Sequence, residues 1–239
     1  MHAQSILKFF LMLVLSVTVV SGVQAAPLHQ KGWDKNKSAL AKAARDSGVP
    51  LGRLTTFASV ESGIGENNLN RHSKAAGMMQ FTRSTWRAQV KQHAKKYGLS
   101  RNVSPRNAYA SAVMGAEYIK FNEQLLAERL HRPISDADIY IAYLLGPDKA
   151  TRVLKANPSH RVTRYVNVSR GNYNLFYHKN RPMTIAEFRR GIAAKLARHE
   201  SSYKNVVLAM KQRYAPRDMM KDEAGLDRLV ANLQTHPET

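Results

Sequence analysis

The sequence predicts a mainly α-helical protein with at most a short β element. Apolar side chains recur every three or four residues over long stretches, most regularly between Ala108 and Leu130, as on the buried side of a helix. Capping residues or prolines precede several of these stretches and glycines follow them, which marks helix ends. The chain has 239 residues, 44% of them hydrophobic, which suits one domain of moderate size plus an extension.

The first 25 residues have the pattern of a secretory leader. Lys8 precedes an apolar run over residues 9–20, and Val23-Gln24-Ala25 is a site that permits cleavage after Ala25. The run is shorter than the roughly 20 residues of a spanning helix, although an uncut anchor is the alternative. The chain has no cysteine, so it has neither a lipid-modified cysteine nor a disulfide. We expect export to the periplasm of a Gram-negative bacterium, with membrane contact only through the leader.

A helix is expected from Pro50 to Ser62, and it carries a carboxylate of special interest, Glu61. Glu61 lies in the last turn, on the same stripe of the helix as Leu54 and Ala58. Partial burial and the negative end of the helix dipole both disfavour the ionised form, so its pKa should exceed the ordinary value of about 4.3. A general acid near neutral pH needs such a shift. From periodicity alone, a solvated helix-end glutamate is an equally good interpretation.

The other elements are placed by their start and stop signals. Residues 27–35 are expected to form a loose lead-in, and residues 161–168 to pair as an edge strand. The aromatic and basic segment 172–183 suits either a wall-contacting loop or a strap over the core. Further helices are expected over 37–47, from Ser84 toward Tyr97, from Ser104 to Leu130, from Ser135 to Gly146, and from a capping box at Thr184 and Glu187 through Arg198.

Three motifs follow one another along the chain. Glu61-Ser62 comes first, Gly77-Met78-Met79-Gln80-Phe81 second, and Ala142-Tyr143-Leu144-Leu145-Gly146 third. In this order they resemble the motifs of lytic transglycosylases with an SLT-type domain, which belong to the lysozyme superfamily. The asparagine that usually follows the tyrosine of the third motif is replaced by Leu144, as expected of a divergent or phage-like branch.

The resemblance implies a lysozyme-like helical domain and a peptidoglycan lytic transglycosylase. Such an enzyme cleaves the β-1,4 bond between N-acetylmuramic acid and N-acetylglucosamine without water and leaves 1,6-anhydromuramic ends. It uses one catalytic glutamate, here Glu61, and neither a metal nor a cofactor. The implied substrate-binding residues are Ser62, Met79, Gln80, Phe81 and Tyr143. The chain then divides into a leader (1–25), a lead-in and helix (26–46), the catalytic domain (47–160) and a basic extension packed on it (161–239).

The distribution of carboxylates favours a mechanism with one acid. Residues 67–116 contain no Asp or Glu, whereas most glycosidases need two carboxylates beside the scissile bond. Glu66 follows two glycines and is expected to face away from Glu61. A hydrolytic muramidase remains an alternative if Glu117 or Asp138 reaches the site.

The charge balance bears on partners. The formal net charge is +20, and residues 150–217 hold 15 basic and two acidic residues. Nucleic acid is a common partner of a basic chain, but for an exported protein the acidic cell wall is the more available polyanion. We therefore expect peptidoglycan strands as the partner and no nucleic acid, with a cell-envelope secretion or conjugation assembly as a further candidate. A non-catalytic basic wall-binding protein is the remaining alternative, and the choice between endo- and exo-cleavage stays open.

Overall fold

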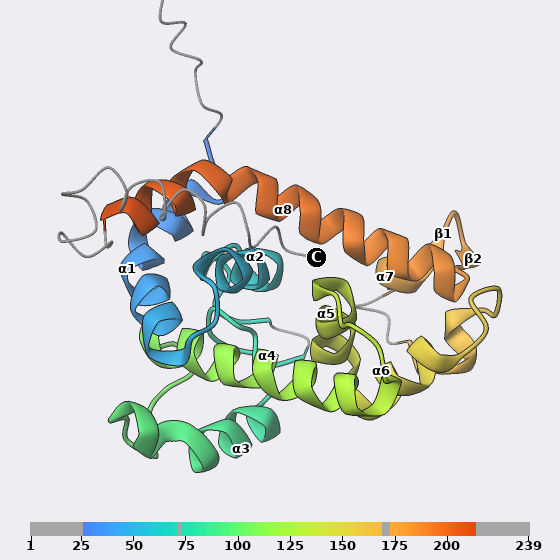
Figure 1. The fold of residues 1–239 in the computed structure, drawn as a ribbon, viewed down its shortest axis with the longest axis horizontal. Helices are drawn as coiled ribbons and strands as arrows, with labels where there is room; N and C mark the ends of the chain where they lie inside the picture. The colour runs from blue at the N-terminus through green and yellow to red at the C-terminus, as the bar shows by residue number, and fades with distance from the viewer. Residues whose placement is uncertain (1–25, 71–72, 169–172, 214–239) are drawn as a thin grey trace, which may run out of the picture.

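The computed structural model describes residues 26–70, 73–168 and 173–213, which fold into packed helices (Figure 1). In these ranges the only paired strands are β1 (Tyr177–His178) and β2 (Arg181–Pro182), which are antiparallel, so the mainly α prediction is confirmed. The helices are α1 (Gln30–Ser47), α2 (Leu51–Ser62), α3 (Arg83–His93), η1 (Ala94–Tyr97), α4 (Ala108–Leu130), α5 (Asp136–Leu145), α6 (Pro147–Lys155), η2 (Val162–Arg164), α7 (Tyr173–Phe176) and α8 (Ile185–Arg213). The predicted leader lies outside the described residues, and no described helix is long and apolar enough to cross a membrane.

Helix α4 forms the centre of the fold. Its middle is almost entirely buried, and α1, α2, α3, α5 and α6 all pack against it. Small residues on α4 allow this close packing: a Cβ atom added to Gly115 would lie 2.5 Å from the Met79 methyl group. The second motif of the sequence is thereby pressed against the central helix.

Helix α1 begins at Gln30, so the prediction of a loose lead-in over 27–35 is wrong. Trp33 is buried in the core, and the Gly32 amide donates a 2.9 Å hydrogen bond to Glu66 Oε1. A Cβ atom on Gly32 would lie 2.2 Å from the Gly63 carbonyl oxygen, so only glycine permits this approach. Contacts with the loop after α2, and not local propensity, extend the helix toward the N-terminus.

Four further features differ from prediction. Helix α3 is capped by Thr82 instead of Ser84, and α4 begins after Asn107, whose side chain accepts from the Ala110 amide. Residues 161–168 contain the 3₁₀ helix η2 and one isolated bridge to Thr184, so the predicted edge strand is wrong there. Helix α6 is not among the predicted helices; its first residue, Pro147, directly follows the predicted end of α5 at Gly146.

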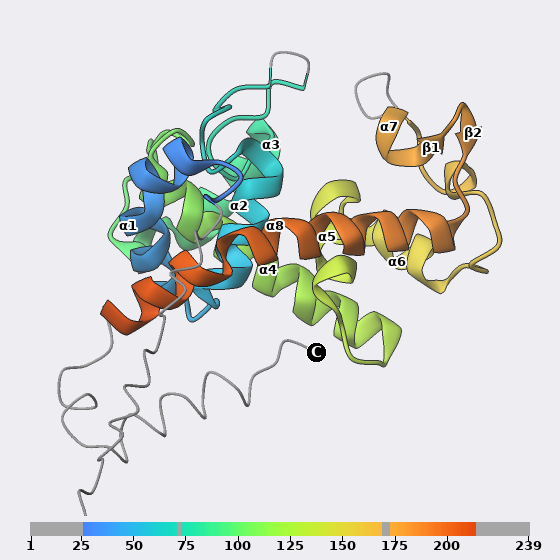
Figure 2. The same ribbon diagram turned by 90° about the horizontal axis from the view of Figure 1, so that it is seen from above.

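Helix α8 crosses the fold and packs against both α2 and α5 (Figures 1 and 2). It begins with the predicted capping box, in which the Thr184 amide donates to Glu187 and the Glu187 amide donates to the Thr184 hydroxyl. Its buried stripe then continues to Val207, well past the predicted end at Arg198. The helix is therefore held along its length by the domain beneath it.

Candidate active site

Helix α2 carries Glu61 to the edge of the core. Leu54 and Ala58, on the same stripe, are fully buried, while Glu61 in the last turn keeps partial exposure. Gly63 ends the helix in a left-handed conformation with φ of 64°. The helix ends one residue after Glu61, so this partly exposed residue stands at a helix end on the edge of the core.

The surroundings of Glu61 favour its protonated form. Desolvation raises its pKa to about 7, against an opposing hydrogen bond from the Tyr140 hydroxyl and the positive charge of Lys195. A carboxyl group with a pKa near 7 holds a proton in about half of the molecules at neutral pH. It is therefore able to donate a proton in one step and to accept one in the next.

Ser62 fastens the end of α2 to the second motif. Its hydroxyl donates to the Met78 carbonyl at 2.6 Å and accepts from the Gly65 amide at 2.8 Å. The side chain is buried, with 3% of its surface exposed. Ser62 thus fixes the position of Glu61 relative to the loop, and its hydroxyl is directed into the protein.

Gln80 lies at the turn of the second motif, in a left-handed conformation with φ of 46°. Its side-chain amide donates to the Gly77 carbonyl at 2.9 Å and to the Asn67 carbonyl at 3.1 Å. These bonds join the loop after α2 to the second motif. Gln80 remains partly exposed, which makes it the predicted binding residue of this motif whose side chain stands nearest to solvent.

Met79 and Phe81 lie in the core, with 0% and 3% of their surfaces exposed. Phe81 packs against Trp86 and Tyr118. Both were predicted to bind substrate, but direct contact between a glycan and either side chain would require it to leave the core. Their evident role is to hold the backbone of the second motif in place.

Tyr143 connects the second motif to α5. Its hydroxyl donates to the Met79 carbonyl at 2.7 Å. The hydroxyl that reaches Glu61 belongs to Tyr140, one turn earlier on α5. Phe57 packs edge-on against both tyrosines, with ring centroids 5.4 and 5.8 Å apart. All three predicted motifs therefore meet around the end of α2.

The three other carboxylates considered from the sequence are engaged elsewhere. Glu66 binds the Gly32 amide and faces His29 across 3.7 Å, on the α1 side of the loop. Glu117 is held by Lys96, Tyr97 and Lys120. Asp138 is held by Arg132, Arg189 and the cap residue Ser135. None of the three is among the groups that shift the pKa of Glu61.

Sequence reasoning missed two residues of this site, Tyr140 and Lys195. Tyr140 lies three residues before Tyr143, on the same face of α5, so helical spacing would have pointed to it. Lys195 comes from α8 and had no local signal. Within the described ranges, no group of three or more His, Asp or Glu side chains gathers as metal ligands would.

A family model for the transglycosylase SLT domain matches residues 38–165, more than half of the chain. The matched span runs from α1 to η2 and contains all three motifs, whereas α8 lies beyond it. The match, the mainly helical fold and the meeting of the motifs at Glu61 agree with one another. The chain belongs to the SLT transglycosylase family, peptidoglycan-degrading enzymes of the lysozyme-like superfamily.

Proposed function

We propose that this protein cleaves the β-1,4 bond between N-acetylmuramic acid and N-acetylglucosamine without water and leaves 1,6-anhydromuramic ends. The observation that carries the proposal is the state of Glu61. Glu61 is a partly exposed residue at the end of a buried helix, and desolvation of its carboxyl group raises its pKa to about 7. Such a group suits a reaction in which one residue is first an acid and then a base.

In the first step, the protonated Glu61 donates its proton to the glycosidic oxygen as the bond from that oxygen to C1 of the muramic residue breaks. The acetamido carbonyl of the same sugar stabilises the positive charge at C1. In the second step, the C6 hydroxyl attacks C1 and transfers its proton to the Glu61 carboxylate. The products are a free hydroxyl on the leaving glucosamine and an internal ether on the muramic residue, so no water is consumed and Glu61 regains its proton.

Hydrolysis would need a second carboxylate to activate water opposite Glu61. The candidates named from the sequence, Glu117 and Asp138, each form ion pairs with two basic residues away from Glu61. This arrangement supports the one-acid reaction over the muramidase alternative. Retention of a protonatable Glu61 likewise favours an enzyme over a wall-binding protein without activity.

The end groups of the product test the proposal. Purified sacculi are digested, and the fragments are measured by mass spectrometry before and after borohydride treatment. Anhydro ends weigh about 18 mass units less than hydrolysed ends, the mass of one water, and borohydride leaves them unchanged. A parallel digest with a hydrolytic muramidase supplies the reducible reference. Mostly reducible ends from this protein would establish hydrolysis instead.

Export to the periplasm is the second part of the proposal, and it rests on the leader pattern of residues 1–25. Expression in a Gram-negative host, followed by cell fractionation and intact-mass measurement, should give a periplasmic chain that begins at Ala26. A full-length chain in the cytoplasm would contradict it. Association with a secretion or conjugation assembly stays a prediction.

A further inference from the structure

Helix α8 lies beyond the span that the family model matches, yet it crosses both helices that build the site. Figures 1 and 2 show it passing α5 first and then, toward its C-terminal end, α2. Glu61 is on α2 and its hydrogen-bond donor Tyr140 is on α5. A side chain of α8 placed between the two crossings would therefore lie near this pair.

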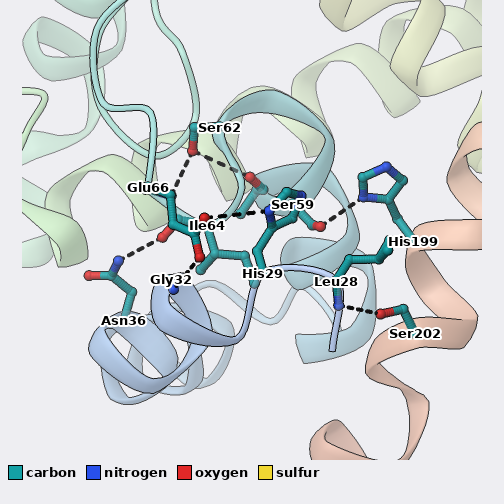
Figure 3. Close-up of polar contacts among 12 residues, drawn as sticks. Leu28, His29, Gly32, Asn36, Ser59, Ser62, Ile64, Glu66, His199 and Ser202 are labelled. Atoms are coloured by element: carbon teal, nitrogen blue, oxygen red, sulfur yellow. Dashed lines mark hydrogen bonds and ion pairs between the residues drawn. The ribbon is translucent and has the colours of Figure 1, made fainter. Parts of the chain in front are cut away.

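The crossing over α2 is fixed by a polar contact. His199 Nδ1 lies 2.7 Å from the Ser59 hydroxyl, as Figure 3 shows, and Ser59 also donates to the Tyr203 hydroxyl at 3.3 Å. Ser59 and Tyr203 are buried, with 2% and 1% of their surfaces exposed. Ser59 precedes Glu61 by two residues, so this contact ties α8 to the last turns of α2.

The crossing over α5 is fixed by an ion pair. Arg189 Nη2 lies 3.4 Å from Asp138 Oδ1, and the Asp138 side chain is 2% exposed. Asp138 precedes Tyr140 by two residues and completes the capping box that starts α5. The two contacts together set both the position of α8 and its rotation about its axis.

Lys195 falls between these contacts. At 1.5 Å per residue it lies about 6 Å along the axis from His199 and about 9 Å from Arg189. Lys195 lies one helical turn from His199, on the same side of α8. It is half-buried, and its neighbours Leu196 and Ile192 are in the core. Within the described residues its ammonium group has no acidic partner within the 4 Å of an ion pair, yet its charge acts on Glu61.

We propose that Lys195 is a positioning residue for the reaction, whose charge stabilises the Glu61 carboxylate between the two proton transfers. The inference rests on the proposed function, because stabilisation of the Glu61 carboxylate matters only if Glu61 gives up its proton in one step and regains it in the next. A direct ion pair would hold the carboxyl ionised and prevent proton donation. A cation beyond contact distance stabilises the carboxylate moderately and leaves its oxygens free to accept the C6 proton.

Three titratable groups near Glu61 and Lys195 keep the same charge near neutral pH. The other titratable groups around the pair are Tyr140 and Tyr143 on α5 and His199 on α8, with Arg198 and His29 beside His199. Desolvation, aided by the charges of Lys195, His29 and Arg198, lowers the pKa of His199 to about 4. Burial raises the pKa of both tyrosines well above the ordinary value. Near neutral pH, His199 and the two tyrosines therefore stay neutral, and their charge does not change while Glu61 titrates.

The test compares Lys195→Gln, Lys195→Arg and the control Lys204→Gln, which changes an exposed lysine on the same helix. Lys195→Gln should move the basic limb of the kcat/KM profile to higher pH, so that relative activity at pH 8 rises about two- to threefold. Its kcat at the optimum should fall about two- to fivefold with a smaller change in KM. Lys195→Arg should restore both properties, and Lys204→Gln should match the parent enzyme.

A measurement without substrate separates this inference from the proposed function. The Glu61 carboxyl group is followed by ¹³C NMR titration in the parent protein and in Lys195→Gln, with Glu61→Gln used to assign its signal. A higher pKa in Lys195→Gln supports the coupling, and identical titrations in both proteins overturn it. Reducible product ends from the parent enzyme would instead overturn the anhydro reaction, whatever the titrations give.

Discussion

Two glutamates of this protein, Glu61 on α2 and Glu117 on α4, begin from similar surroundings and reach opposite states. Both side chains leave helices of the core, and desolvation opposes ionisation of both. The pKa of Glu61 is raised to about 7, whereas that of Glu117 is lowered to about 2. At neutral pH the first carboxyl group exchanges protons and the second stays ionised.

The two carboxyl groups differ in their partners. Glu117 Oε1 accepts hydrogen bonds from Lys96 at 2.8 Å and Lys120 at 3.0 Å, and also from the Tyr97 hydroxyl. Together these hydrogen bonds and charges lower the pKa of Glu117 by more than desolvation raises it, although the side chain is only 8% exposed. Among the described residues, the groups that favour the ionised form of Glu61 are one neutral donor, Tyr140, and one cation, Lys195. A buried carboxylate that is paired with cations stays ionised and stabilises the fold. A buried carboxyl group without a cation in contact has a raised pKa and can transfer a proton.

The largest expected effect is on activity. Glu61→Gln keeps the shape of the side chain but removes its proton, so wall cleavage should fall by roughly 10²-fold or more, the scale for loss of a general acid. Glu117→Gln is the matched control and should retain activity within a few-fold at a temperature where it is folded. Turbidity loss of sacculi measures both. Equal rates for Glu61→Gln and the parent would place the acid elsewhere.

The second effect is on stability, where the roles reverse. Glu117→Gln leaves two lysines around a neutral amide and should lower the free energy of unfolding by about 2 kcal/mol, less than for a fully buried pair because both lysines are partly exposed. The folded pKa of about 2 lies below the ordinary 4.5, so this stabilisation is present above pH 4.5 and is lost as pH falls toward 2. Urea unfolding at pH 7 and pH 3 measures it, and an equal difference at both pH values would contradict the assignment.

The position of Glu61, but not the surroundings of Glu117, could be predicted from the sequence. The apolar stripe through Leu54 and Ala58 and the stop at Gly63 predicted that Glu61 would lie at a buried helix end, and the structure shows it there. Glu117 was considered only as a distant alternative carboxylate. Its partner Lys120 is one turn away on α4, but Lys96 comes from η1, and no periodicity on α4 indicates that contact.

The rest of the site depends on contacts between residues far apart in the chain. Lys195 is 134 residues beyond Glu61, and helical patterning predicts α8 without its placement across α2 and α5. The same limit applies to α1, whose first turns carry Gly32 and form because the loop after α2 packs on them. Local signals thus predicted most helices of the domain and the acid, while tertiary packing decided which groups tune that acid.

A smaller effect is expected on stability at high pH, where Glu61 is ionised. Its folded pKa of about 7 exceeds the ordinary 4.5, so its contribution to stability is fully present below pH 4.5 and is lost as pH rises through 7. Glu61→Gln avoids that loss, so at pH 9 its free energy of unfolding should exceed that of the parent by about 1 kcal/mol, a value that already allows for the partial exposure of the site. At pH 4 the two proteins should be equally stable. Thermal unfolding at both pH values measures this, and a variant less stable than the parent at pH 9 would argue against desolvation.

The smallest effect concerns Tyr140, the hydrogen-bond donor to Glu61. The Tyr140 hydroxyl stabilises the carboxylate, so Tyr140→Phe should raise the pKa of Glu61 and move the basic limb of the kcat/KM profile upward by less than one pH unit. The ring remains, and with it the edge-on packing against Phe57, so the fold should be unaffected. Tyr165→Phe is the control, because its hydroxyl bonds His160 instead. A limb that moves downward, or that moves equally in both variants, would mean that the tyrosine does not hold the charged form. In that case Glu61 would differ from Glu117 even more than its contacts indicate, since Lys195 would be its sole stabilising neighbour among the described groups that act on it.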